Sequence, residues 1–296
     1  MKVGVILPLF SGDPAKVLAA AREAEDLGFD GVFAFDHFFP PGAPRDRAAL
    51  EAFTTLAAVA AATERVAIGT MVTRASLRPT GLLAKQAAWL DAASGERFVL
   101  GIGTGDPIDR PEHEAYGIPE LDKTARREHL EETVTALKAL FRGKPYPGGS
   151  RVSRLEGPLL PAPRPGGPPV WIGAQADAVV RMAGRIADGW NGWGLDAKRF
   201  GEKVEVLRDA AGERSVTPTW AGLVLAGSDD AETKALLDKR RAGGIDDPDW
   251  TGTTEQLSAF LRDLGKAGAA WAVMVLAGPA DRRALLSESV LPDLRS

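Results

Sequence analysis

The 296-residue sequence contains no cysteine, only three histidines and only two tyrosines. Without cysteine the chain has no disulfide, no thiolate nucleophile and no cysteine metal site. The net charge of −4 offers no general basic surface for nucleic acid. Its apolar runs all fall short of the ~18 residues that a membrane span needs. We therefore expect neither nucleic acid nor a membrane as a partner.

The amino-terminal segment MKVGVILPLFSGDP has the lysine and the apolar run of a secretion signal. Pro8 interrupts that run, charge returns at Asp13, and no small-residue cleavage site follows closely. We interpret the segment as the first strand of a cytoplasmic protein.

Short apolar runs alternate with amphipathic stretches along the rest of the chain. Strands are predicted at Val3–Leu7, Val32–Phe35, Val66–Met71, Phe98–Ile102, Val170–Gly173, Gly189–Asn191, Thr219–Leu225 and Trp271–Leu276. Helices are predicted from Asp13-Pro14 to Gly28 and at Ala48–Ala62, Pro79–Ala93, Asp122–Arg142, Ala176–Ile186, Ala197–Ala211, Asp230–Arg241, Thr253–Leu264 and Asp281–Glu288.

Eight uniformly apolar strands that alternate with helices predict a (β/α)8, or TIM, barrel. An open doubly wound sheet has the same alternation and stays an alternative. Residues 1–296 are expected to form one domain, since α/β barrels commonly use this length. Gly143–Pro169 contains eight prolines and six glycines, which predicts an excursion over the surface inserted after the fourth strand.

The segment FAFDHFF places Asp36 and His37 side by side in apolar surroundings. Neighbouring strand residues point to opposite faces, so one of the two would enter a core if the strand continued. At the end of a barrel strand, both can instead face the mouth, where such barrels carry their chemistry. The alternative is that Asp36 caps a turn while His37 packs against Phe38 and Phe39.

Polar and small residues follow other predicted strands as well. The strand ends read GTMVTRASLRP, GIGTGDP, GAQAD and DGWNGWG. Glycine at such positions lets a flat or anionic ligand approach the backbone. The helix expected near Ala176 offers free N–H groups and a favourable dipole to a phosphate.

Two other interpretations of these residues are weaker. GIGTG matches a dinucleotide-binding fingerprint poorly, because the third glycine is misplaced and Pro107 stands where a long helix should open. His113 and His129 have no second histidine at ligand spacing, so no metal site is predicted.

Four segments together resemble a known family: GFDGVFAFDHF, RPTGLLAKQAAWLDAASGERFVLGIGTGD, PPVWIGAQADAVVRMAGRIADGWNGWG and GTTEQLSAFLRDLGKAGAAWAVMVL. They resemble the bacterial luciferase-like oxidoreductases, which are barrels that use FMN or the deazaflavin coenzyme F420. The likeness extends over nearly the whole chain in the right order. It is specific for the family and names no substrate.

The resemblance implies roles for individual residues. Asp36 and His37 would lie beside the coenzyme ring, Met71–Val72 would be a non-proline cis peptide below it, and Thr104, Gly105 and Asp106 would meet its polar edge and the substrate. The expected phosphate-binding turn is Gly173, Ala174, Gln175 and Ala176. Asp177 would repel a phosphate unless it turns away. Sugar-phosphate dehydrogenases of the family have glutamate in place of Asp106 and tryptophan in place of Pro41, which puts that activity in doubt.

These observations predict hydride transfer between coenzyme F420 and a small-molecule substrate. His37 would move the proton, because its unperturbed pKa suits that role near neutrality, and Asp106 would orient the substrate or share the proton transfer. Phe38, Phe39, Trp190 and Trp193 are expected to line an apolar mouth, with core packing as the alternative for Trp190.

The choice between F420 and FMN depends on the coenzyme tail, because F420 carries an acidic phospholactyl–oligoglutamate chain. Arg74, Arg78 and Lys85 are expected to provide cations along it, with solvated surface charge as the alternative. An FMN-dependent monooxygenase, a coenzyme-binding barrel without turnover and a hydrolase using Asp36 and His37 remain alternatives. A homodimer also stays open.

Overall fold

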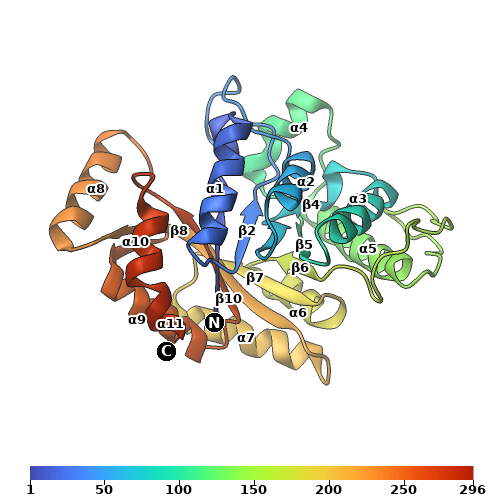
Figure 1. Cartoon of the computed structure of the whole chain (residues 1–296). Helices are drawn as coiled ribbons and strands as arrows, with labels where there is room; N and C mark the ends of the chain where they lie inside the picture. The colour runs from blue at the N-terminus through green and yellow to red at the C-terminus, as the bar shows by residue number, and fades with distance from the viewer. Residues whose placement is uncertain (296) are drawn as a thin grey trace.

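The computed structural model describes residues 1–295, and a closed ring of eight parallel strands forms its centre (Figure 1). The ring closes where β10 pairs with β1, with Val3 opposite Ala272. Its strands are β1 (Lys2–Ile6), β2 (Gly31–Ala34), β3 (Ala67–Thr70), β5 (Phe98–Gly103), β6 (Val170–Gly173), β7 (Gly189–Trp193), β8 (Thr217–Gly227) and β10 (Trp271–Leu276). The prediction of a (β/α)8 barrel is confirmed.

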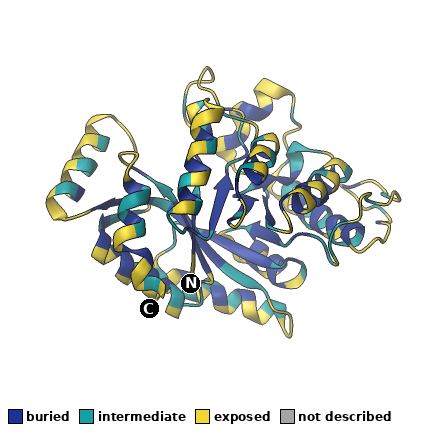
Figure 2. Ribbon diagram, viewed as in Figure 1, coloured by how far each residue is buried: buried dark blue, intermediate teal, exposed yellow. Residues whose placement is uncertain are grey.

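Helices surround the strands, and their buried faces turn toward the ring (Figure 2). They are α1 (Pro14–Asp26), α2 (Ala52–Ala62), α3 (Thr80–Ala93), α4 (Arg110–Tyr116), α5 (Lys123–Phe141), α6 (Asp177–Ile186), α7 (Ala197–Ala211), α8 (Asp230–Ala242), α9 (Thr254–Lys266), α10 (Arg282–Ser289) and α11 (Leu291–Arg295). Two short strands, β4 (Thr73–Arg74) and β9 (Trp250–Thr253), lie outside the ring, as do the 3-10 turns η1 (Leu9–Ser11), η2 (Ala75–Leu77) and η3 (Pro107–Asp109). Within residues 1–295, no helix is both long enough and apolar enough to cross a bilayer.

Local capping signals explain where several helices begin. The Asp13 carboxylate accepts the Ala15 N–H at 2.9 Å ahead of Pro14, which opens α1. Thr253 and Gln256 form the predicted capping box of α9. The second helix begins later than predicted, at Ala52, because Glu51 has extended backbone angles and its carboxylate caps the Thr54 N–H at 2.7 Å.

Aromatic side chains from three strands fill the interior of the ring. The centroids of Phe33 and Trp171 are 5.9 Å apart, those of Trp171 and Trp271 5.7 Å, and those of Phe33 and Trp271 5.9 Å. Glycines on the neighbouring strands leave the space that these rings occupy. A Cβ at Gly69 would lie 2.9 Å from Phe33, and a Cβ at Gly189 would lie 2.4 Å from Trp171.

Two connections depart from an even barrel. The chain between β5 and β6 carries η3, α4 and α5, followed by residues 143–169, in which Tyr146 and Leu155 form an isolated antiparallel bridge. Strand β8 is longer than predicted, and its end pairs with β9 and leads to α8, which stands out on the left of Figure 1.

The tight packing inside the ring gives a first prediction. Gly69→Ala would place a methyl 2.6 Å from the Val99 carbonyl and 2.9 Å from the Phe33 ring, so we expect a loss of about 1–3 kcal/mol in the free energy of unfolding. Gly201→Ala, within α7, meets nothing closer than 3.6 Å and should stabilise by up to about 1 kcal/mol. Urea denaturation of both variants checks this, and a neutral Gly69→Ala would contradict the packing argument.

Candidate active site

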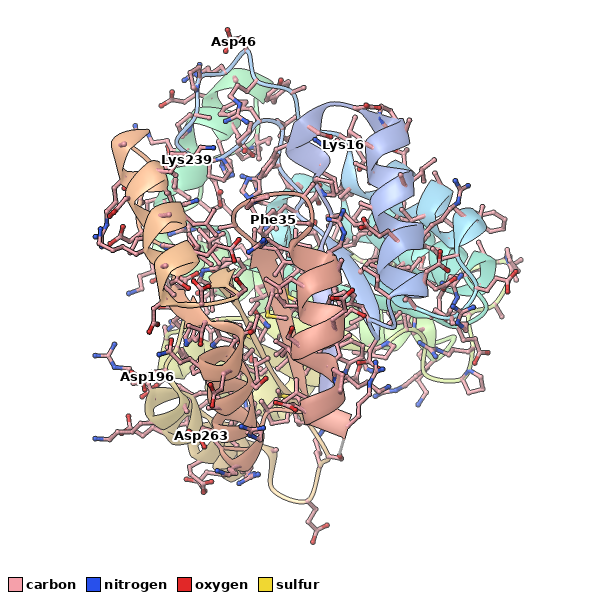
Figure 3. The ribbon with its side chains drawn as sticks, turned by 60° about the vertical axis from the view of Figure 1, so that its left-hand side comes forward. Lys16, Phe35, Asp46, Asp196, Lys239 and Asp263 are labelled. Atoms are coloured by element: carbon pink, nitrogen blue, oxygen red, sulfur yellow. The ribbon has the colours of Figure 1, made fainter. Side chains whose placement is uncertain are left out.

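A cavity of about 970 Å³ opens where the strands β2, β3, β5, β6 and β7 end. Phe35, Met71, Thr104, Gly173 and Trp193 stand at these strand ends and line it. Phe35, labelled in Figure 3, lies near the middle of that view, among the loops. As expected, the polar and glycine-rich strand ends therefore gather around one cavity.

Glycines and one valine form the wall at β3, β5 and β6. The Met71–Val72 peptide bond is cis, as predicted. A Cβ at Gly103 would lie 3.0 Å from a Val72 methyl and one at Gly173 would lie 3.1 Å from the other, so glycine at both positions lets Val72 pack closely against these strands. Gly105 has φ +76° and lies against Arg74 and Asp109. The wall consequently exposes backbone where a flat ligand can lie close to it.

His37 lines the cavity and is held from behind by a buried carboxylate. Its Nδ1 lies 2.9 Å from Glu112 Oε1, and Glu112 Oε2 accepts a hydrogen bond from Arg74. Asp109 Oδ1 lies 3.8 Å from His37 Nδ1 and 3.6 Å from Arg74 Nη1. The Glu112 and Arg74 side chains are 2% and 3% exposed, which makes this a desolvated charge cluster.

The protonation of this cluster follows from its contacts. Burial alone would raise the pKa of Glu112, but the hydrogen bond and charge of His37 and the charge of Arg74 hold that pKa below its usual value. An ionised Glu112 can only accept, so we assign the proton at Nδ1 of His37 as its donor. His37 Nε2 has no partner in the described chain and is the nitrogen open to the cavity.

Asp36 does not face the cavity, contrary to the expectation that it lies beside the coenzyme ring. It is buried, and both of its oxygens accept hydrogen bonds from Arg78. Arg78 also binds Glu51 and stacks 4.4 Å from the centroid of the Phe53 ring. The pair therefore fixes the loop that carries His37, and the geometry removes Asp36 from the residues that could touch a ligand.

Two aromatic residues expected at the mouth also lie elsewhere. Phe38 is exposed away from the cavity and stacks on Tyr116 at 4.0 Å between centroids. Trp190 is fully buried, stacks on Phe200 and donates its indole N–H to the Ala174 carbonyl at 2.8 Å. Because side chains alternate along β7, Trp190 points outward. Trp193 lines the cavity as predicted.

The expected phosphate-binding turn lies at the opposite side of the cavity from β1. Gly173, Ala174, Gln175 and Ala176 all line it, and Gln175 donates to the Trp193 carbonyl at 3.0 Å. Ala176 is the N-cap of α6 and has no side chain that could occupy the first N–H groups. Asp177 turns away and pairs with Lys203, which lowers its pKa.

The cations expected along a coenzyme tail are already paired elsewhere. Arg74 is held by Glu112, Arg78 by Asp36 and Glu51, and Lys85 donates to the Leu160 carbonyl. Instead, the first turns of α5 supply the cavity with cations that the sequence analysis missed. These are Lys123, Arg126 and Arg127.

Lys123 and Arg127 make no ion pair within the described chain, and Arg126 donates to the Gly105 carbonyl at 2.8 Å. The Nε of Arg126, like Nε and Nη1 of Arg74, is buried without a hydrogen-bond partner. We call Lys123, Arg126 and Arg127 the cationic end of the cavity.

Asp106 and Thr104 line the cavity as predicted, but neither contacts His37. Asp106 is exposed at the rim, where its N–H donates to Asp109 Oδ2 at 2.7 Å. The carboxylates nearest His37 are Glu112 and Asp109, which the sequence analysis did not select. Across residues 1–295, no three or more histidine, aspartate or glutamate side chains are grouped so as to hold a metal ion.

Comparison with known proteins identifies a family. A family model described as luciferase-like monooxygenase matches residues 1–282. Two relatives are named F420-dependent glucose-6-phosphate dehydrogenase. The protein from Nakamurella multipartita is 33% identical to this chain over 179 residues, and the protein from Microbacterium testaceum is 32% identical over 194 residues. These alignments cover 60% and 64% of this chain, and they span only 51% and 56% of the two relatives.

Solved structures share the fold at low identity. An F420-dependent secondary alcohol dehydrogenase, in complex with an F420-acetone adduct, superposes with a TM-score of 0.85 at 18% identity, over 100% of this chain and 99% of its own. The EDTA monooxygenase of Chelativorans sp. BNC1 gives 0.84 at 18% identity, over 100% and 93%. The F420-dependent tetrahydromethanopterin reductase of Methanopyrus kandleri gives 0.76 at 20% identity, over 98% of each chain.

The Glu112 contacts give a second prediction. Glu112→Gln should lower the free energy of unfolding by roughly 3 kcal/mol at neutral pH, because it leaves a buried charge cluster without its central anion. The folded-state pKa of Glu112 lies below 4.5, so its ionisation stabilises the fold above about pH 4.5 and ceases to do so as the pH falls through the lowered value. The difference between wild type and variant should therefore shrink in acid.

Glu114→Gln, on the same helix, is the matched control. Glu114 is exposed and pairs with Arg45 at 3.3 Å and Arg110 at 3.2 Å, which predicts a loss below about 1 kcal/mol. Chemical denaturation at neutral and acid pH measures all three proteins. Equal losses in the two variants would contradict the central role of Glu112.

Proposed function

The chain belongs to the luciferase-like monooxygenase family, and on that premise we propose that it transfers a hydride between coenzyme F420 and a small organic substrate at the mouth of the barrel. The observation that carries this proposal is the placement of His37. Fixed by Glu112, it faces the same cavity as the exposed backbone of β5 and β6. A proton-transfer group and a site for a flat ring therefore share one space.

The residues around the cavity fit a flat coenzyme with an anionic tail. The Gly103–Gly105 and Gly173–Ala176 segments would hold the ring and the phosphate, because their backbone is accessible and α6 begins without a side-chain cap. Arg74 lines the cavity, and its buried Nε has no hydrogen-bond partner within the described chain. Unsatisfied buried donors are costly in a folded protein, so a ligand acceptor nearby is the natural partner.

When bound, F420 supplies the hydride chemistry, and the protein supplies position and proton transfer. His37 Nε2 takes a proton from a substrate hydroxyl during oxidation, or donates one to a carbonyl oxygen during reduction. Glu112 keeps the imidazole oriented and stabilises its protonated form, as a buried carboxylate behind a histidine does in other enzymes. Asp106, at the rim, is in a position to orient the substrate.

Two observations favour F420 over FMN. The relatives from Nakamurella and Microbacterium are named F420-dependent, although the chain aligns with only about half of their length. The cationic end, at the first turns of α5, lines the same cavity as the turn before α6 that would hold a phosphate. FMN ends at its phosphate, whereas the carboxylates of F420 would continue to these cations. An FMN-dependent monooxygenase is the alternative.

Removal of the His37 imidazole tests the proton-transfer role. His37→Ala should lower turnover by ~10²–10⁴, the usual effect of losing one general acid–base group, while coenzyme affinity stays within about tenfold of wild type. Steady-state kinetics and a spectroscopic coenzyme titration measure the two effects separately. Near-normal turnover in the variant would show that His37 is not the proton-transfer group.

Removal of charge at the cationic end tests the choice of coenzyme. We expect the double variant Lys123→Gln/Arg127→Gln to weaken F420 binding at least about tenfold and FMN binding much less, and to reduce the salt dependence of F420 binding. The control is Arg142→Gln/Lys144→Gln, which removes the same charge at the other end of α5, roughly 28 Å away for a helix of this length. Tight FMN binding without detectable F420 binding would overturn the choice of coenzyme.

A further inference from the structure

The aromatic side of the cavity specifies a class of substrate. Resting on the proposed function, we propose that the substrate is an uncharged, largely apolar molecule that lies against Phe10, Phe35 and Trp193, with one oxygen directed at His37. We call these three side chains the aromatic wall. They come from three separate segments, η1, the end of β2 and the end of β7, and all three line the cavity.

The aromatic wall is continuous and supported by ring contacts. Phe10 and Phe35 stack with centroids 5.7 Å apart and an interplanar angle of 15°, and Phe35 meets Trp193 at 5.9 Å. The His37 ring lies 6.2 Å from Phe10 and 6.3 Å from Phe35. The group that handles the proton is therefore set into the edge of an apolar surface.

These aromatic rings are only half-buried by the protein itself. Partly exposed rings that line a concave site leave apolar surface for a ligand to cover, and the ligand gains roughly 25 cal/mol per Å² of surface removed from water. Pro41 and Ile108, both lining the cavity, continue the apolar surface toward the rim. An apolar body can thus remain in contact with carbon atoms from the wall to the opening.

Charge is distributed unevenly around the cavity. His37 lies beside the aromatic wall with its Nδ1 committed to Glu112, and Asp109 Oδ1 lies 3.8 Å from that nitrogen. The lysine and arginines that line the cavity are Arg74, which is bound to Glu112, and the three residues of the cationic end. Because the charge of Arg74 is already compensated by Glu112, an anionic substrate group beside it would lose its hydration without gaining an uncompensated cation, which is unfavourable.

An uncharged, largely apolar substrate differs from the sugar phosphate in the relatives' names, because a sugar phosphate carries a dianion and several hydroxyl groups. Asn191 is the amide nearest the wall along β7, and its Nδ2 already donates to Thr219 Oγ1 at 3.0 Å. His37 Nε2 is an open polar group beside the wall and can meet one substrate oxygen.

Calorimetric titration of the coenzyme-loaded protein tests the proposal. The probes are acetophenone, an uncharged aromatic ketone, and 6-phosphogluconate, a charged sugar acid. Acetophenone has no hydrogen on its carbonyl carbon to transfer, and the absorbance of the oxidised coenzyme is followed throughout, so that any oxidation of 6-phosphogluconate is separated from binding. We expect acetophenone to bind at least about tenfold more tightly, and Phe10→Ala to weaken it about tenfold. Trp89→Ala, which removes an aromatic side chain that is 56% exposed on α3, should leave the affinity unchanged.

Several outcomes would overturn the inference. They are tighter binding of 6-phosphogluconate, no binding of acetophenone, or equal effects of Phe10→Ala and Trp89→Ala. Coenzyme loading is measured first, by titration with F420 and with FMN, and the probes are then added to whichever form binds. Failure to bind F420 thus tests the proposed function, whereas the preference between the two probes tests the substrate class.

Discussion

The geometry of the mouth depends on how the interior of the ring is filled. Three large rings, Phe33, Trp171 and Trp271, meet inside it, and strand glycines such as Gly69 and Gly189 leave them room. Each large ring therefore has to lie beside a glycine of the neighbouring strand. This requirement fixes the register of each of these strands against its neighbour. The strand ends carry the cavity, so their positions follow from that packing.

Above the filled interior, a cluster of buried charges holds the side chains of the site in place. Glu112 and Asp109 are buried beside Arg74 and His37, and such carboxylates persist only when their charges are compensated. The short helix α4 is thereby attached to the loop after β2, and Arg45 with Glu114 adds an exposed contact between the same segments. One nitrogen of the His37 imidazole is committed to this cluster and the other makes no hydrogen bond within residues 1–295, which gives the cavity an oriented polar group beside an apolar surface.

Sequence patterns predicted the alternation of strands and helices, the caps at Asp13 and Thr253 and the strand ends that form the cavity, because periodicity and capping are local properties. The same alternation also fits an open doubly wound sheet, so the resemblance to a known family was needed to favour the barrel. They did not settle contacts that depend on orientation. In DGWNGWG the two tryptophans differ by an odd number of positions, so only one can face the cavity, and the pattern did not decide that it is Trp193.

Glu112 was missed because it lies on a seven-residue helix that begins with Arg110 and Pro111 in an apparent loop. Arg74 and Arg78 were expected to provide cations along a coenzyme tail, because the sequence does not reveal their carboxylate partners, which are 38 and 42 residues away. The cations of α5 carried a usable signal, because basic residues in the first turns of a helix oppose its dipole. The aromatic wall lies on η1 and the ends of β2 and β7, whereas the cationic end lies on α5. Because the two groups stand on separate segments, substitutions in one can accumulate without disturbing the other, so the part of the cavity that would select a substrate can diverge while the part that would hold an anionic coenzyme tail is retained.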